Sequence, residues 1–159
     1  MSLLDDPNKT ESLEGLAITA SGLDRNGPTL VPVDRYISPE WAAIEAEKVW
    51  PHVWQVACSV DHVAEPGDFY EYRCGWISIL IVRGDDGELR AFQNACRHRG
   101  NAICQGRTGN AKRGFLCQYH LWSYDLDGRL KGLLREDAAG GLDKSDNSLI
   151  QVSVDTFGG

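Results

Sequence analysis

The stretch that decides the fold runs from Asn94 to Gly128 and reads "NACRHRGNAICQGRTGNAKRGFLCQYHLWSYDLDG". It holds a Cys-x-His pair, Cys96 and His98, and a Cys-x-x-His pair, Cys117 and His120, separated by eighteen residues. Cys and His side chains bind transition metals, and the glycines between the two pairs permit tightly folded backbone. The stretch therefore predicts two loops that present metal ligands to one shared centre.

Two kinds of centre could use this ligand set. A single zinc ion would accept two thiolates and two imidazoles, but structural zinc sites usually group Cys with Cys and His with His. Here each loop supplies one Cys and one His, which suits a binuclear centre in which one iron takes both thiolates and the other both imidazoles. We therefore expect a Rieske-type [2Fe–2S] cluster, with a zinc-stapled interaction domain and an unrelated set of core Cys and His residues as the alternatives. The expected ligands, as both metal and cofactor residues, are Cys96, His98, Cys117 and His120.

Residues beside the ligands should shield the centre and set its electrostatics. Gly100 permits unusual loop backbone, and free N–H groups there can donate to sulfur. Tyr119 and Trp122 are bulky enough to keep water away. Arg99 belongs to the segment from Cys96 to Tyr124, which has five cations and no acid, so the rest of this −7 chain carries −12. These cations are either solvated loop charges or a basic collar around a docking site for an acidic partner.

The composition favours one globular domain without a nucleic-acid or membrane partner. A length of 159 residues with 42% apolar and 25% charged residues suits a single domain with a real core. The net charge of −7 argues against a general nucleic-acid binder. No segment approaches the roughly 20 apolar residues of a membrane helix, and no secretory signal is recognisable, so we expect a cytoplasmic protein.

The five cysteines are an odd number in a chain without an export signal, which favours metal binding over a disulfide framework. Cys58 and Cys74 fall on apolar strand positions, so we expect both to be small buried hydrophobic residues.

Residues 1–30 are polar and lack periodicity, which predicts a flexible N-terminal arm. A helix is expected at about 39–50, capped by Ser38, started by Pro39 and stopped by Pro51.

Beyond the helix the apolar pattern changes to a period of two, which is typical of strands. Alternation covers residues 54–60 and 70–74. A hairpin is expected about Gly84–Gly87, and a tighter one with Asp127-Gly128 as a two-residue turn. The fold class expected is mainly β: an antiparallel sandwich or small barrel, with two cluster-binding loops and one preceding helix.

The segments "VWPHVWQVACSVDHVAEPGDFYEY", "ACRHRG" and "CQYHLWSYDLDGRL" resemble the N-terminal Rieske domain of the alpha subunit of aromatic-ring-hydroxylating oxygenases. The likeness runs from about residue 31 to the end of the chain. It implies that Cys96 and Cys117 bind one iron and that His98 and His120 bind the other. It also implies a Rieske domain over 31–148, followed at 149–159 by the lead-in to a catalytic domain.

The sequence departs from the family pattern at Leu121, where the family usually has Gly between His and Trp. If this position has positive φ, Leu would be strained there. Respiratory Rieske proteins carry an extra Cys in each cluster loop, joined as a disulfide. Here Cys104 has no partner after Cys117, so we expect it to be a free, structural thiol.

The resemblance implies one-electron transfer as the redox module of a ring-hydroxylating oxygenase, in aromatic hydrocarbon catabolism. Electrons would come from a reductase or ferredoxin and leave through His120 towards a mononuclear Fe(II) in a catalytic domain or neighbouring subunit. The remaining histidines, His52 and His62, lack the pairing and the carboxylate that such an iron needs, so this chain alone is not expected to be a complete enzyme. A free-standing Rieske ferredoxin is the alternative.

Overall fold

The computed structural model describes residues 33–134 and 140–158, so the arm expected at 1–30 lies outside the described residues. The chain divides into two compact units, residues 1–43 and 44–159. Helix α2, Asp34–Ile37, was not expected from the sequence. Helix α3, Pro39–Lys48, confirms the predicted helix, and the Ser38 hydroxyl accepts from the Trp41 N–H at 3.3 Å as its N-cap.

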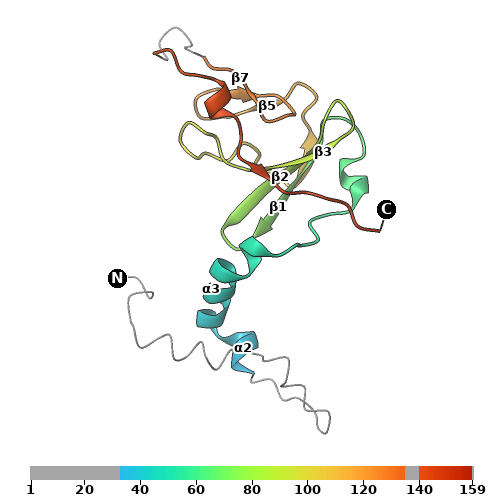
Figure 1. Ribbon diagram of the computed structural model, residues 1–159, viewed down its shortest axis with the longest axis vertical. Helices are drawn as coiled ribbons and strands as arrows, with labels where there is room; N and C mark the ends of the chain where they lie inside the picture. Colours follow the sequence, from blue (N-terminus) through green and yellow to red (C-terminus); the bar gives the residue numbers. More distant parts are fainter. Residues whose placement is uncertain (1–32, 135–139, 159) are drawn as a thin grey trace. The chain divides into compact units, whose positions relative to one another are not determined.

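Two antiparallel sheets make up the second unit (Figure 1). The larger has five strands in the order β4-β1-β2-β3-β8, and the smaller has three in the order β5-β6-β7. The large sheet comprises β1 (Asp68–Cys74), β2 (Ile77–Arg83), β3 (Leu89–Gln93), β4 (Thr108–Asn110) and β8 (Gln151–Val152). The small sheet comprises β5 (Phe115–Leu116), β6 (Ser123–Tyr124) and β7 (Leu130–Gly132). These sheets and the helix before them confirm the expected mainly β, antiparallel fold. Of the two architectures expected, sandwich or small barrel, no closed barrel forms in the described ranges, because neither sheet closes on itself.

Two short 3₁₀ helices, η2 (Trp50–His52) and η3 (Val60–Val63), lie between α3 and β1, and a third, η5 (Ser145–Asn147), lies between β7 and β8. None of the helices in the described part of the chain is long and apolar enough to cross a membrane.

The two faces of the large sheet pack into two different hydrophobic clusters. Because strand side chains alternate, Leu80 and Val82 point to one face while Ile79 and Ile81 point to the other. The first face packs against the small sheet and the loops around Cys96 and Cys117, and forms the larger core. The second face supports a smaller cluster that includes Val63 of η3 and the half-buried Cys58. Cys58 therefore packs as a small hydrophobic residue, and Cys74 is also half-buried.

The predicted hairpins form, but one turn differs from its prediction. Strands β2 and β3 pair from Ile79–Gln93 to Arg83–Leu89, as the turn at Gly84–Gly87 requires. Between β6 and β7 the Asp125 N–H donates to the Arg129 carbonyl, so three residues, not two, form the turn. Gly128, at φ +79°, supplies the left-handed position that ends such a three-residue turn.

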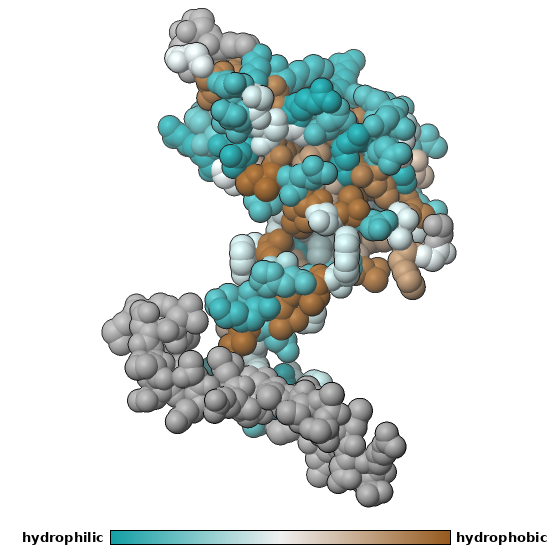
Figure 2. All heavy atoms as spheres, in the orientation of Figure 1, coloured by the Kyte–Doolittle hydropathy of each residue, from teal (hydrophilic) through white to brown (hydrophobic). Residues whose placement is uncertain are grey.

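The strand expected over 54–60 is absent, because residues 54–59 pair with no strand and Val60 begins η3. The alternation also fails to predict burial there, since Trp54 and Val56 are exposed whereas Gln55 and Ala57 are half-buried. Figure 2 shows apolar side chains at the surface around β1 and β2, whereas the end carrying β5 and β7 is mainly hydrophilic in this view.

Candidate metal centre

The two predicted loops share one pattern of closing hydrogen bonds. In the first loop, which follows β3, the Cys96 N–H donates to the Asn101 carbonyl at 2.8 Å, and the Gly100 N–H donates back to the Cys96 carbonyl at 2.8 Å. Each bond brings the two ends of a short segment together. The first loop is therefore a compact turn that holds Cys96 and His98 in fixed positions.

The second loop, between β5 and β6, repeats the pattern. The Cys117 N–H donates to the Trp122 carbonyl at 2.8 Å, and the Leu121 N–H donates to the Cys117 carbonyl at 3.0 Å. Both loops thus present a cysteine at the start of a closed turn and a histidine within it.

The structure brings the four predicted ligands together as two pairs. The rings of His98 and His120 meet edge to face with centroids 4.5 Å apart. Cys96 and Cys117 are 4% and 1% exposed, and their thiols lie close enough for each to shift the pKa of the other. His98 is exposed and His120 half-buried, so the thiols lie inside and the imidazoles lie towards the surface. Among the described residues, no three His, Cys, Asp or Glu side chains converge closely enough to hold one metal ion.

Hydrogen-bond donors surround both sulfurs. The Tyr124 hydroxyl lies 3.3 Å from Cys96 Sγ and accepts the Arg97 N–H at 3.1 Å, which leaves its own proton to point at the sulfur. Asn101 Nδ2 lies 3.8 Å from Cys117 Sγ. Such donors favour negative charge on sulfur and are typical of the surroundings of metal-bound thiolates.

The pKa values of these groups follow from burial and from the donors. Burial raises the pKa of Cys96. Burial also opposes ionisation of Cys117, but the backbone N–H groups of Tyr119 and His120 outweigh it and lower the pKa of that thiol. Burial, followed by the charges of His120 and Arg99, lowers the pKa of His98. Thiolate and neutral imidazole are the forms that bind metals, so the site favours them at Cys117 and His98.

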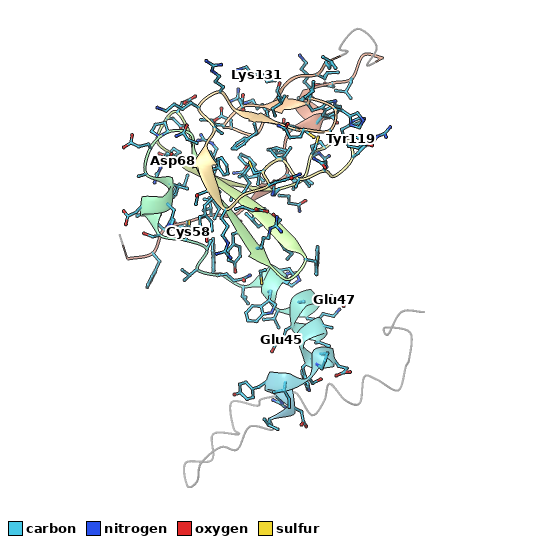
Figure 3. All side chains as sticks on the ribbon, turned by 180° about the vertical axis from the view of Figure 1, so that it is seen from behind. Glu45, Glu47, Cys58, Asp68, Tyr119 and Lys131 are labelled. Carbon is cyan, nitrogen blue, oxygen red and sulfur yellow. The ribbon has the colours of Figure 1, made fainter. Side chains whose placement is uncertain are left out.

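The residues expected beside the ligands take separate places. Trp122 is 7% exposed and stacks on His98, with ring centroids 5.0 Å apart and an interplanar angle of 9°. Tyr119 is 58% exposed, and its ring lies 3.8 Å from that of His120. Arg99 and Gly100 lie on the surface of the first loop. Trp122 therefore covers one face of the otherwise exposed His98 ring, whereas Tyr119 offers an aromatic face to solvent. Figure 3 shows Tyr119 well separated from Cys58 and Asp68.

Leu121 has φ +57°, and it is the one non-glycine residue with positive φ in the part of the chain described by the structure. The strain anticipated for a leucine at this position is therefore present. It is 39% exposed, directly beside His120.

Sequence reasoning missed Tyr124, Asn101 and Asn94, although all three contact the loops or their sulfurs. The signal available was weak, because a tyrosine that alternates with Trp122 looks like an ordinary core residue. Cys104 is a free thiol, 8% exposed, and burial raises its pKa to about 12. His62 is exposed, and its ring meets that of Tyr70 edge to face with the two centroids 5.4 Å apart.

Comparison with known proteins identifies this arrangement. The family described as Rieske [2Fe-2S] domain matches residues 53–145. The chain is 34% identical over 125 residues to the benzene 1,2-dioxygenase subunit alpha of Pseudomonas putida, covering 78% of this chain and 28% of that protein. It is 33% identical over 135 residues to the glycine betaine monooxygenase oxygenase subunit of Chromohalobacter salexigens, covering 85% of this chain and 30% of that protein.

Solved structures agree. A quaternary ammonium Rieske monooxygenase bound to an inhibitor has a TM-score of 0.72 at 32% identity, over 79% of this chain and 35% of that one. Naphthalene 1,2-dioxygenase with indole in its active site has a TM-score of 0.69 at 31% identity, over 74% of this chain and 27% of that one. The chain thus spans about a third or less of the relatives it matches. These matches imply a [2Fe–2S] cofactor, and they show that the chain belongs to the Rieske [2Fe–2S] domain family, alongside the alpha subunits of Rieske oxygenases.

Proposed function

We propose that Cys96 and Cys117 bind one iron, and His98 and His120 the other iron, of a [2Fe–2S] cluster that carries one electron at a time. The observation that carries this proposal is the meeting of two loops, each with one Cys and one His, so that thiols pair inside and imidazoles pair near the surface. The cluster supplies reversible one-electron chemistry, and two histidines in place of two cysteines raise its potential.

The chain's own residues fit the extra negative charge of a reduced centre. The hydroxyl of Tyr124 and the amide of Asn101 point donors at the two sulfurs. Five cations occur between Cys96 and Tyr124, all of them exposed and with no acid in the same segment. Both features stabilise added electron density, the exposed cations less so at high salt.

We further propose that the chain is the electron-transfer part of a Rieske oxygenase. It takes electrons from a reductase or ferredoxin, and it passes them through His120 towards a mononuclear Fe(II) site that lies beyond these 159 residues. His120 suits this role because its imidazole is half-buried at the surface side of the ligand set. The relatives' names include aromatic and quaternary-amine substrates, so the substrate class extends past aromatic hydrocarbons.

The test of the cluster is a metal and sulfide assay on the purified protein, with EPR spectra before and after dithionite. Two irons and two sulfides, with a rhombic EPR signal that shows nitrogen coupling after reduction, are expected. The variants C117S and H120A should lose this signal, whereas the matched variants C74S and H62A should keep it. A colourless protein with one zinc would contradict the proposal.

The oxygenase role needs a second experiment. Stopped-flow reduction by a reductase or by a reduced ferredoxin should be fast and should slow as salt rises, because the basic segment attracts an acidic donor. If the reduced chain also delivers its electrons to a separate, intact oxygenase at catalytic rates, it acts as a free-standing ferredoxin, and the oxygenase-module proposal is wrong.

A further inference from the structure

A polar group lies inside the larger core, on the face of the large sheet that carries the cluster loops. Glu71 is 3% exposed on β1, and Asn94 is 5% exposed just after β3. Their neighbours on the same face include the apolar Phe69 and Leu80. Burying a carboxylate lowers the free energy of unfolding, compared with an apolar side chain, unless hydrogen-bond partners compensate for the lost water.

Asn94 closes the first cluster loop from inside. Its Oδ1 accepts the N–H groups of Ile103 and Cys104, each at 2.9 Å, and its Nδ2 donates to the Cys104 carbonyl at 2.9 Å. One side chain, two residues before Cys96, therefore holds the far end of the loop beside its start. Neither Ile103 nor Cys104 lies in a strand, so this amide replaces strand pairing for them.

Glu71 reinforces the orientation of the Asn94 amide. Glu71 Oε1 lies 3.1 Å from Asn94 Nδ2 and also accepts from Ser78 Oγ at 2.8 Å and from Arg73 Nε at 2.7 Å. If the amide were turned over, its oxygen would face the carboxylate and the Cys104 carbonyl, and its NH₂ would face two N–H groups. The carboxylate and the Cys104 backbone thus favour the same orientation of the amide, the one that closes the loop.

We propose that Glu71 is a positioning residue for the cluster: acting through Asn94, it fixes the first loop and therefore the places of Cys96 and His98. This inference rests on the proposed function for its consequence in the loaded protein. Glu71 contacts none of the four ligands, so it takes no part in ligation or in electron transfer.

The test compares E71A, E71Q and N94D with the matched variant E88A, which removes an exposed carboxylate from the β2–β3 turn. The first measurement is hydrogen exchange in the metal-free protein. E71A and N94D should raise exchange at Ile103 and Cys104 at least about tenfold, because one buried hydrogen bond to a charged group is lost. E71Q keeps an oxygen acceptor, so it should stay within about threefold of the parent protein, as should E88A.

The second measurement is made on the loaded protein. E71A and N94D should broaden the EPR signal of the reduced cluster and release iron to a chelator roughly tenfold faster, whereas E71Q should restore parent behaviour. Unchanged exchange and iron release in a folded E71A would overturn the inference. If E71A does not fold, N94D decides in its place, because it keeps the acceptors for Ile103 and Cys104, removes the donor and sets a second carboxylate against Glu71. If the parent protein binds no cluster, the proposed function is wrong. Hydrogen exchange in the metal-free protein still tests whether Glu71 acts on the first loop through Asn94.

Discussion

Gly100 and Leu121 hold the same position in two loops that follow one hydrogen-bond pattern. Each lies four residues beyond a cysteine, donates its N–H to that cysteine's carbonyl, at 2.8 and 3.0 Å, and has positive φ, +70° and +57°. A Cβ added to Gly100 would meet nothing within 4 Å. Both loops therefore require a left-handed backbone conformation at this position. Glycine occupies it in the first loop and leucine in the second.

Replacing Leu121 by glycine should stabilise the metal-free protein by about 1 kcal/mol, because a left-handed leucine costs roughly 1–2 kcal/mol and glycine loses part of that gain through its chain entropy. The matched variant G100A should destabilise by about 1 kcal/mol, since it adds backbone strain without any steric contact. Urea unfolding of both variants measures the change. A less stable L121G would show that contacts of the leucine side chain outweigh its strain.

Tyr124 is fully buried, with 0% exposed, and points its hydroxyl at Cys96 Sγ. Phenylalanine at this position would remove a donor that favours the more negative, reduced state. We expect Y124F to lower the reduction potential by about 50 mV, the equivalent of one modest hydrogen bond for a one-electron couple. Redox titration followed by EPR measures it, with Y70F, which removes a hydroxyl from the other face of the large sheet, as control. An unchanged potential in Y124F would show that its hydrogen bond does not distinguish the two redox states.

The pKa of Cys104 is raised from 9.0 to about 12, first by burial and then by the charge of Glu71. Between these two values the unfolded thiol ionises and the folded thiol does not, so the contribution of Cys104 to stability is complete below pH 9 and is lost as pH rises towards 12. Unfolding measured from pH 8 to pH 10 should show a decline that is smaller in C104A. C74A serves as control. An identical decline in C104A would assign the alkaline loss to other groups.

Gly114 has φ +87°, and a Cβ there would collide with the backbone carbonyl of Tyr124. Because backbone cannot turn aside as a side chain can, G114A should destabilise the protein by about 2–4 kcal/mol and disturb the pairing of β5 with β6. Gly106 has open space and no positive φ, so G106A should change stability by no more than about 0.5 kcal/mol. Thermal unfolding of the two variants separates these expectations.

The sequence predicted the helix, the central hairpin and the ligand set because each depends on local signals. Ser38, Pro39 and the turn glycines act within a few residues, and the two Cys-His pairs are recognisable by their spacing alone. The strand expected over 54–60 failed because no strand pairs with this segment, and Trp54 and Val56, which the alternation placed on an apolar face, are exposed. The Asp127-Gly128 turn was misjudged by one residue, since the same dipeptide suits both two- and three-residue turns.

The supports of the loops were beyond sequence reasoning. Glu71 and Asn94 lie twenty-three residues apart and meet only after β1, β2 and β3 pair. A Glu inside an apolar strand pattern indicates that a polar partner is buried beside it, but the pattern does not identify that partner. The spacing in the sequence pointed to the four proposed ligands, whereas it gave no sign of the residues that support their loops.

The first loop continues from β3 of the five-stranded sheet, and the second loop joins β5 to β6 of the three-stranded sheet. A group bound by both loops therefore links two sheets that share no strand. When the group binds, its bonds to both loops join the two sheets. The free energy of binding then adds to the free energy of folding. We therefore expect a shortage of iron and sulfide to shorten the lifetime of the newly made chain against proteolysis, because the chain without its cluster is less stable.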